Sequence, residues 1–180
     1  MNRCKWVKES NPLYIKYHDK EWGIPSFSDN YLFEMLLLES FQAGLSWECI
    51  LNKRKDFEKA FDNFDYHKIA KYDNKKINVL MSNSKIIRNK LKIQAAIINA
   101  KVFIKIQSEY GSFSNYIWHF TDNKIIKNMN DVFLPTSTLS DQISADLKKR
   151  GMKFVGSTII YSYLQAIGII NDHELNCSFY

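Results

Sequence analysis

The 180-residue sequence has few residues that break or cross-link a chain: six glycines, three prolines and three cysteines. An odd number of cysteines cannot pair completely, so we expect no disulfide framework and a reducing, cytoplasmic setting. No apolar run approaches the roughly 20 residues of a membrane-spanning helix. The opening segment MNRCKWVKESNP lacks the apolar core of a secretory signal. The sequence therefore predicts a cytoplasmic protein without a membrane segment.

The composition is that of a globular protein, with 46% hydrophobic and 14% aromatic residues. Its 25 basic and 19 acidic residues give a net charge of +6. A basic surface attracts polyanions such as nucleic acids or anionic lipids. Only four of the cations are arginines, and lysine, asparagine and isoleucine are abundant throughout. Background composition therefore explains much of the charge, which favours nucleic acid only modestly.

Helical periodicity dominates, and the sequence predicts an all-α fold. In the helix expected at 28–42, Leu32, Phe33, Leu36 and Leu37 face inward. The longest pattern, at 85–110, places Leu91, Ala95, Ile98, Val102 and Ile106 on its inner face. Further helices are expected at 47–61, 67–72, from 74, 112–120, 140–150 (capped by Ser140) and 156–167. Residues 121–139 are expected to form a connection, and no strand pair is predicted.

Aromatic residues gather near the start of the chain, namely Trp6, Tyr14, Tyr17, Trp22 and Trp47. They alternate with polar residues in a segment of weak periodicity, which favours a lined cavity at least as much as core packing. Aromatic faces can sandwich a flat base, and more strongly if that base is cationic.

Glu39 lies on the same predicted helical face as Leu32, Met35 and Leu36. A buried, unpaired carboxylate costs several kcal/mol or is neutralised by a raised pKa. Such a group is a candidate for a functional site. The alternative is a rotated helix with Glu39 in solvent, and the sequence does not decide between them.

Two segments suggest contact with nucleic acid. Gly44 and Leu45 form a turn whose leucine either wedges between base steps or caps a helix.

Residues 140–167 predict two helices joined by a short hairpin, and N–H groups at the start of the second helix can hold a phosphate. The alternative is a plain helical hairpin with a solvated basic edge. The residues involved are Gly156, Ser157 and Thr158, with Lys148, Lys149, Arg150 and Lys153 nearby.

The two ends of the chain carry a possible metal site of Cys4, His18, His173 and Cys177. Two thiolates and two imidazoles make a closed, structural zinc set. On a helical turn, His173 and Cys177 would share one face. The gap between Cys4 and His18 is not a zinc-knuckle spacing, so spacing alone favours ordinary thiols and histidines. We expect His67 and His119 to be structural or solvated.

The sequence resembles bacterial DNA-3-methyladenine glycosylase I over nearly its whole length. The segments that carry the resemblance are RCKWV (3–7), PLYIKYHDKEWG (12–23), LFEMLLLESFQAGLSW (32–47), FVGSTIIYSYLQAIGIINDH (154–173) and the closing Cys177. The resemblance implies a helix-hairpin-helix glycosylase fold over residues 1–180, with two helical lobes and the hairpin at about 140–167.

The resemblance also implies roles for the candidate residues. It places Glu39 in the base pocket as the catalytic residue, with Asp172 ranked below it. The implied base-binding residues are Trp6, Tyr14, Tyr17, Trp22 and Trp47; those for DNA are Gly44, Leu45, Lys153, Gly156, Ser157 and Thr158. The implied ligands of a structural Zn²⁺ that joins the termini are Cys4, His18, His173 and Cys177.

The implied activity is hydrolytic removal of 3-methyladenine, flipped out of alkylated double-stranded DNA, without strand cleavage and by a monomer. Two alternatives stay open. One is a zinc-stabilised helix-hairpin-helix module that binds DNA without catalysis. The other is a glycosylase for a different alkylated purine.

Overall fold

The computed structural model describes residues 1–127, 129 and 134–180, and it is mostly helical, as the sequence predicted. The helices are α1 (Pro12–Lys20), α2 (Asp29–Gln42), α3 (Trp47–Ala60), α4 (Tyr66–Ile69), α5 (Asn74–Ser82), α6 (Lys90–Tyr110), α7 (Phe113–His119), α8 (Thr138–Lys149) and α9 (Ser157–Ala166), with a 3-10 turn at Asp62–Phe64. Within the described ranges, no helix is both long enough and apolar enough to span a bilayer.

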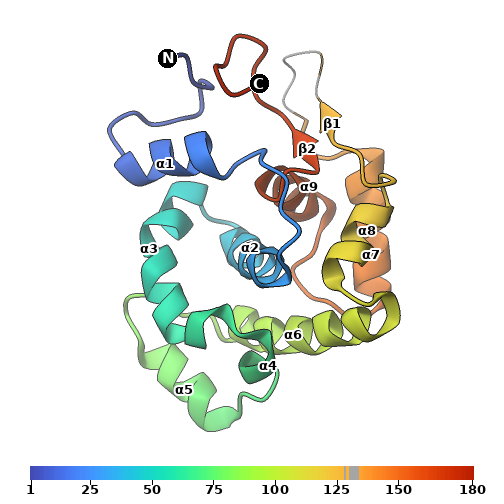
Figure 1. Ribbon diagram of the computed structural model, residues 1–180. Coiled ribbons are helices and arrows are strands. Elements are labelled where there is room, and N and C mark those ends of the chain that lie inside the picture. Colours follow the sequence, from blue (N-terminus) through green and yellow to red (C-terminus); the bar gives the residue numbers. More distant parts are fainter. Residues whose placement is uncertain (128, 130–133) are drawn as a thin grey trace.

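Helix α2 lies at the centre of the molecule, with α3, α6 and α9 arranged around it (Figure 1). Its predicted inward residues Leu32, Phe33, Leu36 and Leu37 are buried, as are its other apolar residues. Because neighbouring helices cover α2 on several sides, most of its side chains are removed from bulk solvent.

The predicted inner face of α6 is wrong at two positions. Leu91 and Ile98 are 68% and 38% exposed, whereas Ile93, Ala100 and Phe103 are fully buried. Helix α6 carries apolar residues on more than one face, so periodicity alone did not identify the face that packs on the core.

A short parallel strand pair joins β1 (Ile126–Lys127) to β2 (Ile170–Asn171). The expectation of no strand pair is therefore wrong. Strands of two residues have no detectable period, and this pairing depends on bringing distant segments together. The predicted connection at 121–139 includes β1, and residues 128 and 130–133 within it lie outside the described part.

Helix α8 begins at Thr138, slightly before the predicted Ser140. Ser137 is the N-cap, and Ser140 completes a capping box with it. Residues 150–156 then connect α8 to α9, which packs against α8. Helix α1 was not anticipated; the Asn11 side chain caps it and Pro12 occupies its first turn.

Candidate active site

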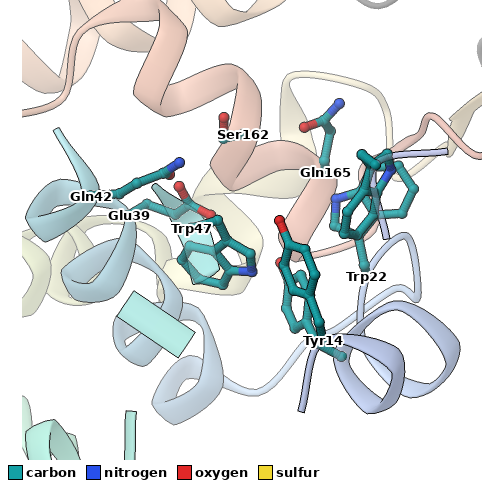
Figure 2. A pocket seen from close by; sticks show the side chains of 9 residues that line it. Tyr14, Trp22, Glu39, Gln42, Trp47, Ser162 and Gln165 are labelled. Carbon is teal, nitrogen blue, oxygen red and sulfur yellow. The ribbon is translucent and has the colours of Figure 1, made fainter. Parts of the chain in front are cut away.

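A cavity of about 280 Å³ opens between α1, α2, α3 and α9 (Figure 2). This volume is near the lower end of the range for small-molecule sites, roughly 300–1,000 Å³. The cavity brings together Glu39 and the whole predicted aromatic group. Its lining residues are Trp6, Tyr14, Tyr17, Trp22, Glu39, Gln42, Trp47, Ser162 and Gln165.

Aromatic rings form the walls of the cavity. Trp6 meets Trp22 and Tyr14 edge to face, with ring centroids 4.8 and 5.3 Å apart, and Tyr17 lies 5.1 Å from Trp47. The indole Nε1 atoms of Trp6 and Trp47 are buried and have no hydrogen-bond partner within the described residues. The walls therefore offer stacking surfaces and two donors to a flat ligand.

Glu39 is 2% exposed, so the alternative that it faces solvent is wrong. Its Oε2 atom has no hydrogen-bond partner among the described residues. Burial raises the pKa of the Glu39 carboxyl to about 8. The pKa of the Tyr17 phenol is raised by burial and then by the neighbouring Glu39. Burial thus favours a neutral Glu39, and a cationic ligand would favour its ionised form.

Three polar residues in the cavity were missed by sequence reasoning: Gln42, Ser162 and Gln165. Ser162 and Gln165 lie three residues apart in the apolar helix α9, so they share one face. Gln165 is a large polar residue inside a buried helix, and that placement was the available signal.

The turn between α2 and α3 presents the predicted Gly44 and Leu45. Gly44 has φ +79°, a conformation that favours glycine, and Leu45 is 40% exposed. Behind the turn, the Lys92 ammonium donates to the carbonyl oxygens of Phe41 (2.8 Å) and Ala43 (2.6 Å). These hydrogen bonds from Lys92 therefore connect the end of α2 to α6 beside the cavity.

The segment between α8 and α9 is also hydrogen-bonded to α6. The Lys153 N–H donates to Asn99 Oδ1 (2.8 Å), and Asn99 Nδ2 donates to the Lys153 carbonyl (2.9 Å). Among the described residues, no side chain caps the start of α9 at Gly156–Thr158. The Lys153 side chain is exposed, but Arg150 is not a free cation, since it pairs with Asp146 and Glu109.

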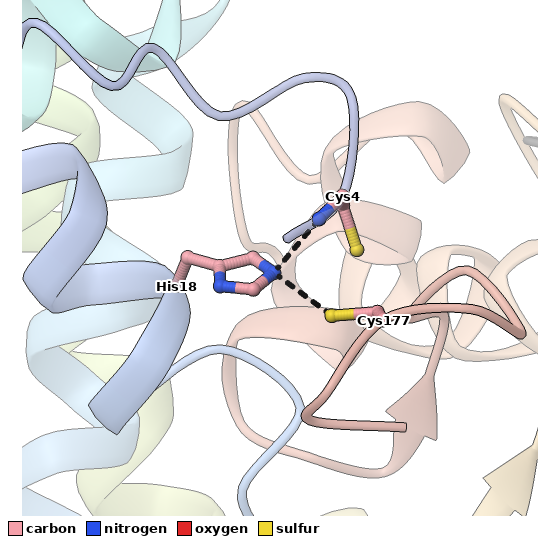
Figure 3. A group of neighbouring side chains, drawn as sticks. All are labelled: Cys4, His18 and Cys177. Atoms are coloured by element: carbon pink, nitrogen blue, oxygen red, sulfur yellow. Dashed lines mark hydrogen bonds between the residues drawn. The ribbon is translucent and has the colours of Figure 1, made fainter. Parts of the chain in front are cut away.

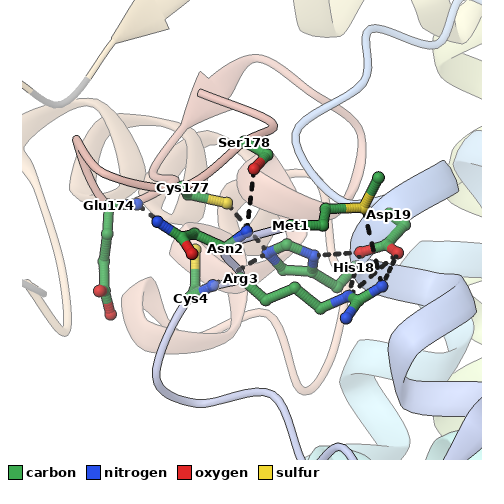
Figure 4. Close-up of polar contacts among 9 residues, drawn as sticks. All are labelled: Met1, Asn2, Arg3, Cys4, His18, Asp19, Glu174, Cys177 and Ser178. Atoms are coloured by element: carbon green, nitrogen blue, oxygen red, sulfur yellow. Dashed lines mark hydrogen bonds and ion pairs between the residues drawn. The ribbon is translucent and has the colours of Figure 1, made fainter.

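The chain termini lie side by side, and a buried cluster of Cys4, His18 and Cys177 forms where they meet (Figure 3). The Sγ and imidazole nitrogen atoms of this cluster lie within 4.8 Å of one another. The Nδ1 atom of His18 bonds to Asp19 Oδ1 (2.7 Å), and Arg3 holds the same carboxylate (Figure 4). The Nε2 atom of His18 thus faces the thiols.

His173, the fourth predicted ligand, lies beside this cluster rather than within it. Its ring centroid is 4.9 Å from that of His18. Its Nδ1 bonds to Asn171 Oδ1 (2.8 Å), while its buried Nε2 has no partner in the described part of the chain. His173 and Cys177 do not share a helix, because the chain after β2 forms turns.

Together with the neighbouring His173, the cluster supplies the two thiols and two imidazoles of a closed zinc site. Burial raises the pKa of the Cys4 thiol to about 12 and lowers the pKa of His173 to about 4. Both shifts favour the neutral forms of Cys4 and His173. The unpartnered His173 Nε2 and the two buried thiols fit a bound Zn²⁺, which binds thiolate and neutral imidazole.

Residues 6–180 match the model of the methyladenine glycosylase family. The chain is 43% identical to DNA-3-methyladenine glycosylase 1 of Escherichia coli (strain K12), covering 100% of this chain and 97% of the relative. It also resembles a crystal structure of 3-methyladenine DNA glycosylase I, with TM-score 0.94, 41% identity and 98% of both chains covered. A variant of 3-methyladenine DNA glycosylase I in complex with 3-methyladenine has TM-score 0.94 and 34% identity, covering 99% of this chain and 97% of the other. The chain therefore belongs to the methyladenine glycosylase family.

Proposed function

We propose that this protein hydrolyses the N-glycosidic bond of 3-methyladenine in alkylated DNA, as a repair glycosylase. The observation that carries the proposal is a buried carboxyl, Glu39, with an unpartnered oxygen inside an aromatic cavity. The model of the methyladenine glycosylase family matches residues 6–180, and one similar structure is a complex with 3-methyladenine.

The chemistry of the lesion explains why this pocket is sufficient. Methylation at N3 gives adenine a formal positive charge, so the base leaves as a neutral molecule and needs little acid catalysis. Glu39 accepts hydrogen bonds from the base and stabilises positive charge in the transition state. Tyr17, Trp6 and Trp47 supply stacking surfaces, and their arrangement excludes water from the faces of the base.

We infer that DNA approaches along the α2–α3 turn and the α8–α9 connection. Leu45, exposed at the tip of its turn, fills the gap left by the flipped nucleotide. The uncapped N–H groups at Gly156, Ser157 and Thr158, with Lys153, hold backbone phosphate in a helix-hairpin-helix manner. A monomer of two lobes over residues 1–180 acting on duplex DNA stays a prediction.

A structural Zn²⁺ belongs to the same proposal. Cys4, His18, His173 and Cys177 would hold it, while Asp19 and Asn171 orient the two imidazoles. A site with four protein ligands leaves no position for a reactive water, so the metal would join the termini rather than take part in base release.

The test is chromatography of bases released from methylated duplex DNA. We expect the wild type to release 3-methyladenine without cutting the strand. Glu39→Gln should lower kcat/KM about 10- to 100-fold, because it removes charge but keeps shape. Glu58→Gln, an exposed matched control, should leave release unchanged.

Other outcomes identify the alternatives. DNA binding without any released base would indicate a binding module. Release of a different base alone would indicate a glycosylase for another alkylated purine. Equal release by the wild type and Glu39→Gln would contradict the role of Glu39.

A further inference from the structure

We infer that Asp172 is a positioning residue that makes the pocket selective for an adenine base, by fixing which end of the Gln165 amide faces the cavity. The inference rests on the proposed function and deepens it. It concerns discrimination between N3-methylated adenine and N3-methylated guanine.

The Gln165 side chain spans the cavity wall between the base pocket and Asp172. It lines the cavity, and its Nε2 donates to Asp172 Oδ2 at 2.5 Å. The same carboxylate oxygen accepts a hydrogen bond from Tyr161 at 2.7 Å. Figure 2 shows the Gln165 amide oxygen turned toward Ser162 and the nitrogen turned away.

The orientation follows from hydrogen-bond chemistry. Asp172 Oδ2 accepts both hydrogen bonds, from Tyr161 and from Gln165, whereas an amide has one donating and one accepting end. The nitrogen of Gln165 must therefore face Asp172, and the reverse orientation would set oxygen against oxygen. Asp172 is itself 3% exposed. It follows Asn171, which is held in the β1–β2 pair, so its carboxylate has a fixed position.

The fixed amide presents an acceptor to the ligand. Gln165, Glu39 and Ser162 all line the cavity, the Gln165 amide oxygen is turned toward Ser162 (Figure 2), and no described donor bonds to Gln165 Oε1. Adenine carries an amino group at position 6, which donates, whereas guanine carries a carbonyl there, which accepts. A hydrogen-bond acceptor in the cavity wall can accept from the adenine amino group and repels the guanine carbonyl.

Without Asp172, the Gln165 amide is free to rotate and to present its nitrogen to a guanine carbonyl. Selectivity therefore needs both residues: Gln165 to touch the base and Asp172 to prevent the amide from reversing. Tyr161 lies on the other side of Asp172 and is not part of the cavity lining.

The experiment measures kcat/KM for release of 3-methyladenine and 3-methylguanine from the same methylated duplex. Asp172→Leu should lower the ratio of the two constants about tenfold, with slower release of 3-methyladenine and faster release of 3-methylguanine. Gln165→Met, which keeps the length but removes both polar ends, should slow 3-methyladenine about tenfold and leave 3-methylguanine within about threefold. These sizes correspond to about one hydrogen bond. Tyr161→Phe, the matched control, should leave the ratio within about twofold.

Zinc content and thermal midpoint are recorded for each variant, because Asp172 precedes His173. Gln165→Met lies outside that segment and decides the question if Asp172→Leu fails to fold. Equal slowing of both bases in Gln165→Met would overturn the inference, as would an unchanged ratio in a folded Asp172→Leu. A wild type that releases no 3-methyladenine would instead overturn the proposed function.

Discussion

At Glu39 the fold buries an acid without giving its Oε2 atom a partner within the described residues. An ionised carboxylate in that position would cost several kcal/mol, and the raised pKa, about 8, reflects this cost. The free protein tolerates the residue by keeping it protonated. A cationic base in the pocket would supply the missing partner and favour the ionised form.

The raised pKa predicts a pH-dependent stability. Between about pH 4.5 and 8, the folded state holds a proton on Glu39 that the unfolded chain has lost. The free energy of unfolding must therefore decrease as the pH rises through this window, by up to about 1.4 kcal/mol per pH unit from this group. Below about pH 4.5, Glu39 is protonated in both states and does not destabilise the fold. Above about pH 8, the full destabilisation from ionising the buried Glu39 is reached.

Urea unfolding of the wild type and Glu39→Gln at several pH values measures this effect. The glutamine cannot ionise, so the difference in free energy of unfolding should grow in its favour from pH 5 to 8. Parallel pH profiles for the two proteins would show that Glu39 does not titrate in the window.

At the scale of elements, Lys92 on α6 joins the end of α2 to the body of the protein. Its buried ammonium bonds to the carbonyl of Phe41 in the last turn of α2 and to that of Ala43, the C-cap residue. This is a favourable place for a cation because the helix dipole is negative there. Burial lowers the pKa of Lys92. The turn with Gly44 and Leu45 follows directly, so Lys92 supports the part of the chain proposed to enter DNA.

Lys92→Met should lower the free energy of unfolding by about 2 kcal/mol, the size expected for losing hydrogen bonds to a charged group. Lys90→Met, in the exposed first turn of the same helix, is the matched control and should change it by less than about 0.5 kcal/mol. Urea unfolding distinguishes the two. Equal effects of both changes would contradict the capping role.

At the scale of the whole molecule, the two ends of the chain are held together around Cys4, His18 and Cys177. Backbone contacts also join them, since the Ser178 N–H donates to the Asn2 carbonyl at 2.9 Å. Gly23 allows His173 to approach, because a Cβ there would lie 2.8 Å from the imidazole Cε1. The ring centroids of Trp22 and His173 are 4.6 Å apart, so His173, beside the cluster, also supports the aromatic wall.

We expect one zinc per chain by elemental mass spectrometry. Cys177→Ser should lose the metal and lower Tm by at least about 5 °C, since 1 kcal/mol shifts Tm by roughly 2–4 °C in a protein of this size. Cys49→Ser, at the cysteine outside the cluster, should keep both metal and Tm. A wild type purified without zinc, or a Cys177→Ser protein that retains it, would contradict the proposed site.

The sequence by itself determined most helices and the candidate pocket residues. Helical periodicity and caps are local signals, so α2, α3 and α9 were predicted within a few residues, and an acid within an apolar helix identified Glu39 as unusual. The resemblance supplied the zinc ligands, which spacing alone did not favour.

Tertiary structure decided features that depend on segments distant along the chain. Only packing determined that Leu91 and Ile98 of α6 face outward, because the helix has more than one apolar face. Only chain proximity paired β1 with β2. Likewise, the direction of the Gln165 amide is set by Asp172, since a side chain with one donating and one accepting end takes its orientation from its neighbour.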